Sequence, residues 1–221
     1  MSQSTFPAAV LFDMDGTLID SEPYWISSET SLAADYGHVW TEENAHEMIG
    51  KSLYDSSAML KEKFSIENLS VQGIIDRLTN EVVEQLQEQL HFRPGALELL
   101  IELKQAGIKT ALVTMSMKRM AMAVVDQIPF EAFDVVVAGD DVRFGKPHPE
   151  PYLKAAELLS VPVEDCIAFE DSSTGLQSAV AAGTFAIGVP NLIRLPEGPN
   201  RKIIPTLVGL TLAQLKEMRN A

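Results

Sequence analysis

Cysteine and positive charge are scarce in this chain of 221 residues, and each shortage excludes a class of protein. A single cysteine, Cys166, excludes an internal disulfide, and its apolar surroundings favour a buried structural thiol over a catalytic one. Lysine and arginine number 17 against 31 aspartates and glutamates, which gives a formal net charge of −14. Nucleic acids and anionic lipids require a positive protein face, so we expect neither as a partner.

Long apolar runs and targeting signals are also missing. No run approaches the roughly 20 apolar residues that a membrane-spanning helix needs. The N-terminal residues contain neither a basic segment ahead of an apolar one nor a lipidation pattern. We therefore expect a cytoplasmic protein with no membrane partner. A hydrophobic content of 46% is sufficient for one good core and a small second domain.

The segment from residue 20 to residue 90 is predicted to be helical throughout. Ser21 and Pro23 form a plausible helix start, because proline is favoured in the first turn. Further helices are expected after Thr41, over residues 53–64, and after Ser70. The hydroxyls of Thr41 and Ser70 are candidate N-caps. The last helix has the clearest apolar periodicity, carried by Ile74, Ile75, Leu78, Val82, Val83, Leu86 and Leu90.

The sequence on either side of this segment alternates between short apolar strands and helices. The expected strands cover residues 10–12, 109–114, 133–138, 166–169 and 185–189, and the expected helices cover residues 96–105, 117–128, 150–159, 175–182 and 211–219. Apolar strands without alternation are typical of a parallel sheet that is covered on both faces. The prediction is an α/β fold with a Rossmann-like core of residues 1–19 and 91–221, interrupted by a small helical-bundle cap domain of residues 20–90.

Two carboxylates, Asp13 and Asp15, follow the first predicted strand. Alternation along an extended chain would place both side chains on the same side. Two like charges at close range are costly unless a cation lies between them or one of them holds a proton. Such a pair can supply a nucleophile beside a metal and a general acid and base. The ordinary alternative is a polar turn after a strand.

Polar groups also follow three later strands. They are Thr114 with Ser116, Lys146 after a glycine, and the pair Glu170 and Asp171. Each alone has a simpler explanation as a strand end, a solvated turn or a helix cap. Because the carboxyl ends of parallel strands open at one edge of the sheet, their joint occurrence indicates a site there.

With these motifs in order along nearly the whole chain, the sequence resembles haloacid dehalogenase superfamily hydrolases with a helical cap inserted after the first strand. That subgroup includes sugar-phosphate phosphatases and β-phosphoglucomutase-like proteins. The resemblance is carried by the motifs Asp13–Leu18, Thr114, Gly145–Pro147 and Glu170–Gly175.

The resemblance implies a reaction in which Asp13 attacks phosphorus while Asp15 protonates the leaving oxygen and later activates water. It also implies Mg²⁺ bound by Asp13, by the backbone carbonyl of Asp15 and by Asp171, with Glu170 in support. General chemistry agrees, because phosphoryl transfer depends on charge neutralisation and Mg²⁺ prefers oxygen ligands.

Four residues are expected to bind the phosphate. Lys146 would supply a positive charge, worth about 4 kcal/mol for a unit pair 4 Å apart at an effective dielectric constant near 20. The Thr114 hydroxyl and the N–H groups of Met115 and Ser116 would add hydrogen bonds. Met115 departs from the resemblance, since relatives usually have a small or polar residue there.

The cap is expected to select the substrate. By the resemblance, Gly50 and Lys51 belong to a loop that reaches over the active site, and Glu22 and Trp25 line its entrance. The alternative is that Lys51 is merely solvated and that Trp25 belongs to the core of the cap.

We therefore predict a monomeric, Mg²⁺-dependent phosphatase of a small phosphorylated metabolite, such as a sugar or polyol phosphate. One alternative is a hexose-phosphate mutase, but the cap histidine and arginine of that branch are absent near Trp25 and Leu53. Another is a non-catalytic protein that binds a phosphometabolite, although such a protein would not need Asp15 as a proton donor. The presence of Asp15 also disfavours dehalogenase and phosphonate-cleaving activities.

Overall fold

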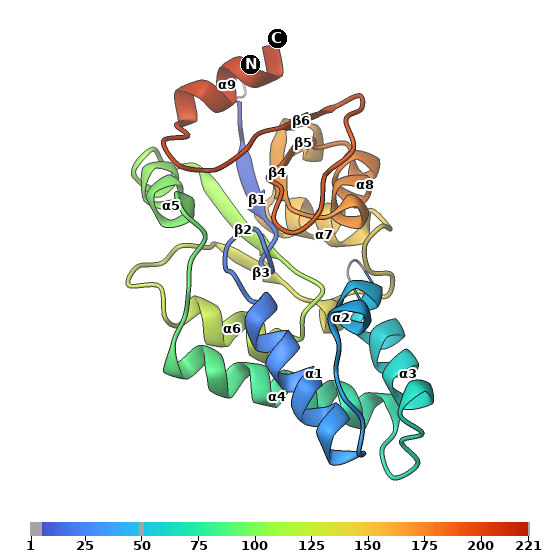
Figure 1. Cartoon of the computed structure of the whole chain (residues 1–221). Helices are drawn as coiled ribbons and strands as arrows, with labels where there is room; N and C mark the ends of the chain where they lie inside the picture. The colour runs from blue at the N-terminus through green and yellow to red at the C-terminus, as the bar shows by residue number, and fades with distance from the viewer. Residues whose placement is uncertain (1–5, 49–50, 221) are drawn as a thin grey trace. The chain divides into compact units, whose positions relative to one another are not determined.

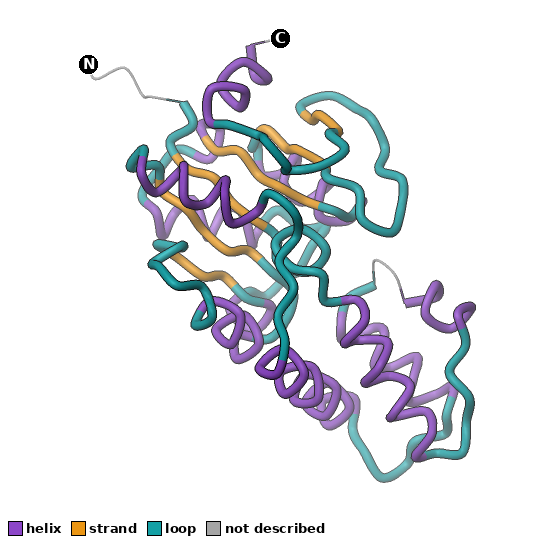
Figure 2. The backbone as a smooth tube through the Cα atoms, turned by 60° about the vertical axis from the view of Figure 1, so that its left-hand side comes forward, coloured by secondary structure: helices purple, strands orange, loops and turns teal. Residues whose placement is uncertain are grey.

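The computed structural model describes residues 6–48 and 51–220 and contains two compact units. The first consists of Met1–Asp20 and His91–Ala221, and the second of Ser21–Leu90. Figures 1 and 2 show a sheet with helices in the first unit and helices in the second. Within the described residues, no helix combines the length and the apolar character that crossing a membrane would require.

A six-stranded parallel sheet forms the centre of the first unit, in the order β3-β2-β1-β4-β5-β6. Its strands are β1 (Ala9–Phe12), β2 (Lys109–Val113), β3 (Val135–Val137), β4 (Cys166–Glu170), β5 (Phe185–Gly188) and β6 (Arg201–Ile203). Its helices are α5 (Ala96–Gln105), α6 (Lys118–Val125), α7 (Glu150–Leu159), α8 (Ser173–Ala182) and α9 (Leu212–Asn220), with short 3-10 turns at Gly139–Asp141 and Val163–Asp165. The expected α/β class with a parallel sheet is confirmed.

Both faces of the central strands are covered, as their unalternated apolar sequences predicted. Leu11 belongs to a core cluster that includes side chains of α7 and α8. The next residue, Phe12, stacks on Phe169 with ring centroids 5.1 Å apart. In Figure 1, α5 lies on the other side of the sheet from α7 and α8. Cys166 is buried, and burial raises the pKa of its thiol to about 12, as befits a structural residue.

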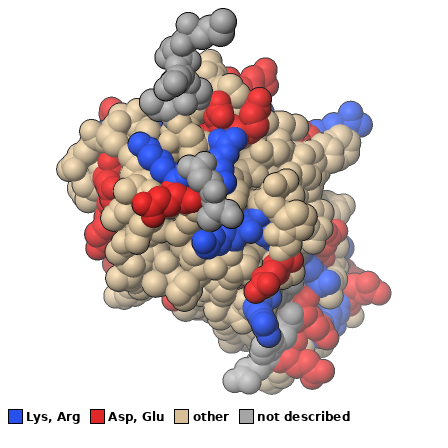
Figure 3. Space-filling view, turned by 90° about the horizontal axis from the view of Figure 1, so that it is seen from above, with Lys and Arg blue, Asp and Glu red and all other residues tan. Residues whose placement is uncertain are grey.

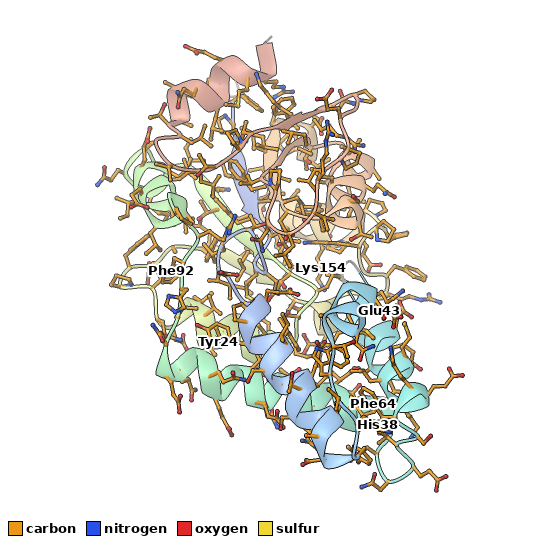
Figure 4. All side chains as sticks on the ribbon, viewed as in Figure 1. Tyr24, His38, Glu43, Phe64, Phe92 and Lys154 are labelled. Atoms are coloured by element: carbon orange, nitrogen blue, oxygen red, sulfur yellow. The ribbon has the colours of Figure 1, made fainter. Side chains whose placement is uncertain are left out.

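The second unit consists of α1 (Glu22–Asp35), α2 (Glu42–Met48), α3 (Leu53–Lys63) and α4 (Val71–Glu88). Its apolar core includes Leu32, Leu60 and Leu78. The ring of His38 stacks on Phe64 at 4.8 Å, and the two labelled side chains lie together in Figure 4.

Hydroxyl caps begin α2 and α4 as the sequence suggested, whereas the Ser21 side chain makes no capping hydrogen bond at the start of α1. Ser70 Oγ accepts a hydrogen bond of 3.0 Å from the Gly73 amide at the start of α4. Thr41 and Asn44 exchange hydrogen bonds of 3.3 Å, so asparagine fills the place that glutamate takes in the usual capping box.

Several element boundaries differ from the predicted ones, and β6 was not predicted. Strand β6 is three residues long and begins with Arg201 and Lys202, so it has no apolar pattern; its pairing with β5 defines it. Helix α8 begins at Ser173 because Ser172 Oγ accepts a hydrogen bond of 3.0 Å from the Gly175 amide.

The acidic excess of the chain does not exclude basic side chains from the surface, and Figure 3 shows both kinds interspersed on one face.

Candidate active site

The order of the strands creates the location of the site. The chain moves outward from β1 to β2 and β3, and then returns to place β4 on the other side of β1. The strand order therefore reverses between β1 and β4, and the loops after these two strands leave the sheet in opposite directions. A crevice opens at such a topological switch point. Asp13 follows β1, Glu170 ends β4, and the Asp13 amide donates a 3.0 Å hydrogen bond to the Phe169 carbonyl.

Three carboxylates meet at this point. Asp13, Glu170 and Asp171 each offer an oxygen, and these oxygens lie within 4.8 Å of one another. Glu170 is fully buried and Asp13 is 7% exposed. Burial, opposed by Lys146 and assisted by the neighbouring carboxylates of Glu170 and Asp15, raises the pKa of Asp13 to about 7. Burial and the same kind of repulsion hold the pKa of Asp171 well above its ordinary value.

This cluster fits a hard divalent cation. The donors are carboxylate oxygens from two adjacent strand ends, which is the ligand type that Mg²⁺ prefers. Their mutual repulsion is the cost that a bound cation would remove. By donor type, burial and spacing, these three residues could hold a divalent metal ion.

Lys146 connects two of these carboxylates. Its ammonium lies 2.6 Å from Asp13 Oδ1 and 2.7 Å from Glu170 Oε1, and it donates a 2.8 Å hydrogen bond to the Val113 carbonyl. Only 6% of its side chain is exposed. Burial alone would lower the pKa of Lys146, but Asp13 and Glu170 raise it above its ordinary value, so the side chain stays charged.

Asp15 is held by the residues that follow β2. Ser116 Oγ donates to Asp15 Oδ2 at 2.7 Å, and Thr114 Oγ1 donates to the same oxygen at 3.3 Å. The Ser116 amide in turn donates to Thr114 Oγ1 at 3.0 Å. The structure thus brings Thr114 and Ser116 to the second carboxylate of the motif, in a contact that the sequence reasoning did not anticipate.

Met115 acquires a structural explanation. Its thioether sulfur accepts a hydrogen bond of 3.2 Å from the backbone amide of Lys146. The residue that departs from the family pattern therefore supports the segment that carries Lys146.

Two glycines allow the close approach of the acidic loops. Gly16 has φ +80°, and a Cβ there would lie 2.0 Å from Asp171 Oδ2. A Cβ on Gly175 would lie 1.9 Å from Glu170 Oε2. Glycine is required at both positions because any side chain would displace a carboxylate of the cluster.

Tyr152 is a site residue that the sequence reasoning missed. It lies on α7, is fully buried, and its hydroxyl is 2.5 Å from Glu170 Oε1. A tyrosine on the apolar face of a helix has the pattern of an ordinary core residue, so the sequence contains no separate signal for this contact.

The cap residues predicted to contact substrate belong to the second unit. Trp25 packs against its apolar core, Lys51 is exposed, and Glu22 is the first residue of α1. Gly50 lies outside the described residues. Substrate contact by these four residues stays a prediction.

Comparison with known proteins identifies the family of this chain. Residues 10–189 match the family model described as haloacid dehalogenase-like hydrolase. The chain is 36% identical over 176 residues to a phosphorylated carbohydrates phosphatase of Thermotoga maritima, covering 79% of this chain and 81% of that protein. It is 32% identical over 191 residues to hexitol phosphatase A of Escherichia coli, covering 81% of each.

A solved structure shows the same fold. The phosphate complex of CbbY from Rhodobacter sphaeroides superposes with a TM-score of 0.87 at 30% identity, covering 96% of this chain and all of that one. The family match includes Asp13, Lys146 and Asp171. The chain belongs to the haloacid dehalogenase-like hydrolase family, and within it to the phosphatases.

Proposed function

We propose that this enzyme hydrolyses the phosphate monoester of a small sugar or polyol, with Mg²⁺ as cofactor and Asp13 as nucleophile. The observation that carries the proposal is that Asp13 contacts the Lys146 ammonium and lies in one cluster with the carboxylates of Glu170 and Asp171. The names of the two similar phosphatases, which refer to phosphorylated carbohydrates and to hexitols, support the substrate class.

In the first step, an Asp13 carboxylate oxygen attacks phosphorus. The bond between phosphorus and the leaving alkoxide oxygen breaks, and Asp15 donates a proton to that oxygen. The products of this step are the free alcohol and an aspartyl phosphate at Asp13. The ammonium of Lys146, 2.6 Å from Asp13 Oδ1, is placed to stabilise the charge that develops on the phosphoryl oxygens.

In the second step, Asp15 accepts a proton from water while the water oxygen attacks phosphorus. The bond between phosphorus and Asp13 breaks, which releases inorganic phosphate and restores the carboxylate. Ser116 and Thr114, which both donate to Asp15 Oδ2, fix this acid and base in one orientation. Mg²⁺ bound by Asp13, Asp171 and Glu170 would neutralise the phosphoryl oxygens and orient the phosphate.

Phosphate release from p-nitrophenyl phosphate in the presence of Mg²⁺ tests the proposal. Asp13→Asn removes the nucleophile but keeps the shape, and we expect the turnover rate to fall by a factor of about 10³ or more. Asp126→Asn is the matched control, because this aspartate is exposed and follows α6. Its rate is expected to stay within a factor of about 2 of the wild-type rate.

A wild-type rate no higher than that of Asp13→Asn would contradict the proposal. A panel of sugar and polyol phosphates, assayed for released phosphate, then identifies the substrate. Conversion of β-glucose 1-phosphate to glucose 6-phosphate without net phosphate release would establish the mutase alternative instead.

A further inference from the structure

The hydroxyl of Tyr152 takes no part in the two chemical steps, yet it contacts the centre of the site. Its side chain has no exposed surface, and its oxygen lies 2.5 Å from Glu170 Oε1. Burying a hydroxyl is costly unless it is hydrogen-bonded, and a bond to a carboxylate is among the stronger ones available. The Tyr152 ring also lies 5.3 Å from the Lys146 ammonium, so the residue packs against both partners of the ion pair.

Glu170 Oε1 is shared by two donors of different kinds. One is the charged Lys146 ammonium at 2.7 Å, and the other is the neutral Tyr152 hydroxyl at 2.5 Å. The other oxygen, Glu170 Oε2, accepts a longer hydrogen bond of 3.3 Å from Ser172 Oγ. The orientation of this carboxylate therefore depends mainly on Lys146 and Tyr152.

The Lys146 ammonium has no donor left over for a substrate phosphate. An ammonium has three donors, and Asp13, Glu170 and the Val113 carbonyl take all three in this structure. A substrate phosphate must therefore displace at least one of these acceptors. When Lys146 turns to the phosphate, the hydroxyl of Tyr152 remains in place, because it comes from a buried face of α7.

We propose that Tyr152 is a positioning residue that keeps the Glu170 carboxylate in the metal-binding orientation when Lys146 engages the phosphate. The inference rests on the proposed function, because it assumes that Glu170 helps to bind Mg²⁺. A metal ligand that is oriented by a neighbouring donor typically loses 10-fold to 100-fold in metal affinity when that donor is removed. The expected effect of deleting the hydroxyl thus falls on Mg²⁺ binding as well as on turnover.

Tyr152→Phe tests this role, because it removes one oxygen and keeps the ring beside Lys146. Calorimetric titration of the metal-free protein with Mg²⁺ is expected to give a dissociation constant about 10-fold higher than that of the wild type. Tyr36→Phe is the matched control, since it deletes a hydroxyl bonded to Asn68 in the second unit. Its dissociation constant is expected to equal the wild-type value.

A double-mutant cycle with Glu170→Gln shows whether the effect passes through Glu170. If Tyr152 acts by orienting this carboxylate, its substitution has little further effect on Mg²⁺ affinity once Glu170 is replaced. Equal losses in both backgrounds, or an unchanged affinity in Tyr152→Phe, would overturn the proposal while leaving the phosphatase function intact. Failure of the wild type both to bind Mg²⁺ and to release phosphate would instead overturn the proposed function.

Discussion

Glu29 is a carboxyl residue of α1 whose surroundings change its chemistry. It is 8% exposed, and burial raises the pKa of its carboxyl to about 8, with repulsion from Glu22 as the smaller cause. The ordinary pKa is 4.5. In the folded protein at neutral pH, Glu29 therefore keeps its proton, whereas it ionises when the chain unfolds.

The free energy of unfolding consequently falls as the pH rises. Below pH 4.5 the carboxyl is neutral in both states; between pH 4.5 and about pH 8 only the unfolded state ionises, and above that the cost is constant. We expect Glu29→Gln to gain up to about 1.4 kcal/mol of stability per pH unit relative to the wild type across this interval.

Urea unfolding at pH 5 and at pH 8 measures this gain. Burying the glutamine amide has a cost that does not depend on pH. The test is therefore how the difference in stability between variant and wild type changes with pH. The exposed substitution Glu84→Gln on α4 serves as the control. A difference between Glu29→Gln and wild type that stays the same at both values of pH would contradict the expected behaviour.

Helices and strands could be predicted from the sequence where interactions between neighbouring residues define them. The bounds of α5 and α7 agree with the predicted ones, because both follow a clear apolar period between strong helix breakers. Strand β6 was missed because no pattern in Arg201–Ile203 distinguishes it from a loop, and only its pairing with β5 makes it a strand. Tertiary contacts, which the sequence does not display, determine such elements.

The serine N-caps of α4 and α8 make the same capping hydrogen bond, but only the cap of α8 also contacts Glu170. Ser70 and Ser172 each accept a 3.0 Å hydrogen bond from the amide three residues later. Replacing either by alanine is expected to cost about 1 kcal/mol of stability. Ser172 also bonds to Glu170, so only Ser172→Ala should lower kcat for p-nitrophenyl phosphate.

Chemical denaturation of both variants measures the loss of stability, and steady-state kinetics measures the loss of kcat. Ser70→Ala is expected to lose stability with kcat unchanged. An equal fall of kcat in both variants would show that the loss comes from general destabilisation and not from the contact with Glu170.

For the whole molecule, the topology explains why so many residues of the site could be predicted. Asp13, Lys146 and Asp171 follow strands of one parallel sheet, so their alignment at one edge follows from the fold class alone. The contacts of Tyr152 and Met115 could not be predicted in this way. They depend on the packing of α7 and of the loop before it, and no pattern in the sequence shows which side chains these segments bring to the site.

The same topology concentrates negative charge at the switch point of a chain that already carries a net charge of −14. A cation that binds the folded state but not the unfolded chain should therefore stabilise the protein. We expect Mg²⁺ at 100 times its dissociation constant to raise the free energy of unfolding by about 2.7 kcal/mol over the value in EDTA. Thermal and urea unfolding with and without Mg²⁺ measure the change.

Asp171→Asn removes one ligand of the cluster and one repelling charge at once. It should raise the stability in EDTA, because less repulsion remains among the buried carboxylates, and it should abolish most of the gain from Mg²⁺. Glu84→Gln changes the net charge equally at an exposed position of α4 and should keep the full gain. If Asp171→Asn also kept the full gain, the stabilising ion would bind elsewhere than at this cluster.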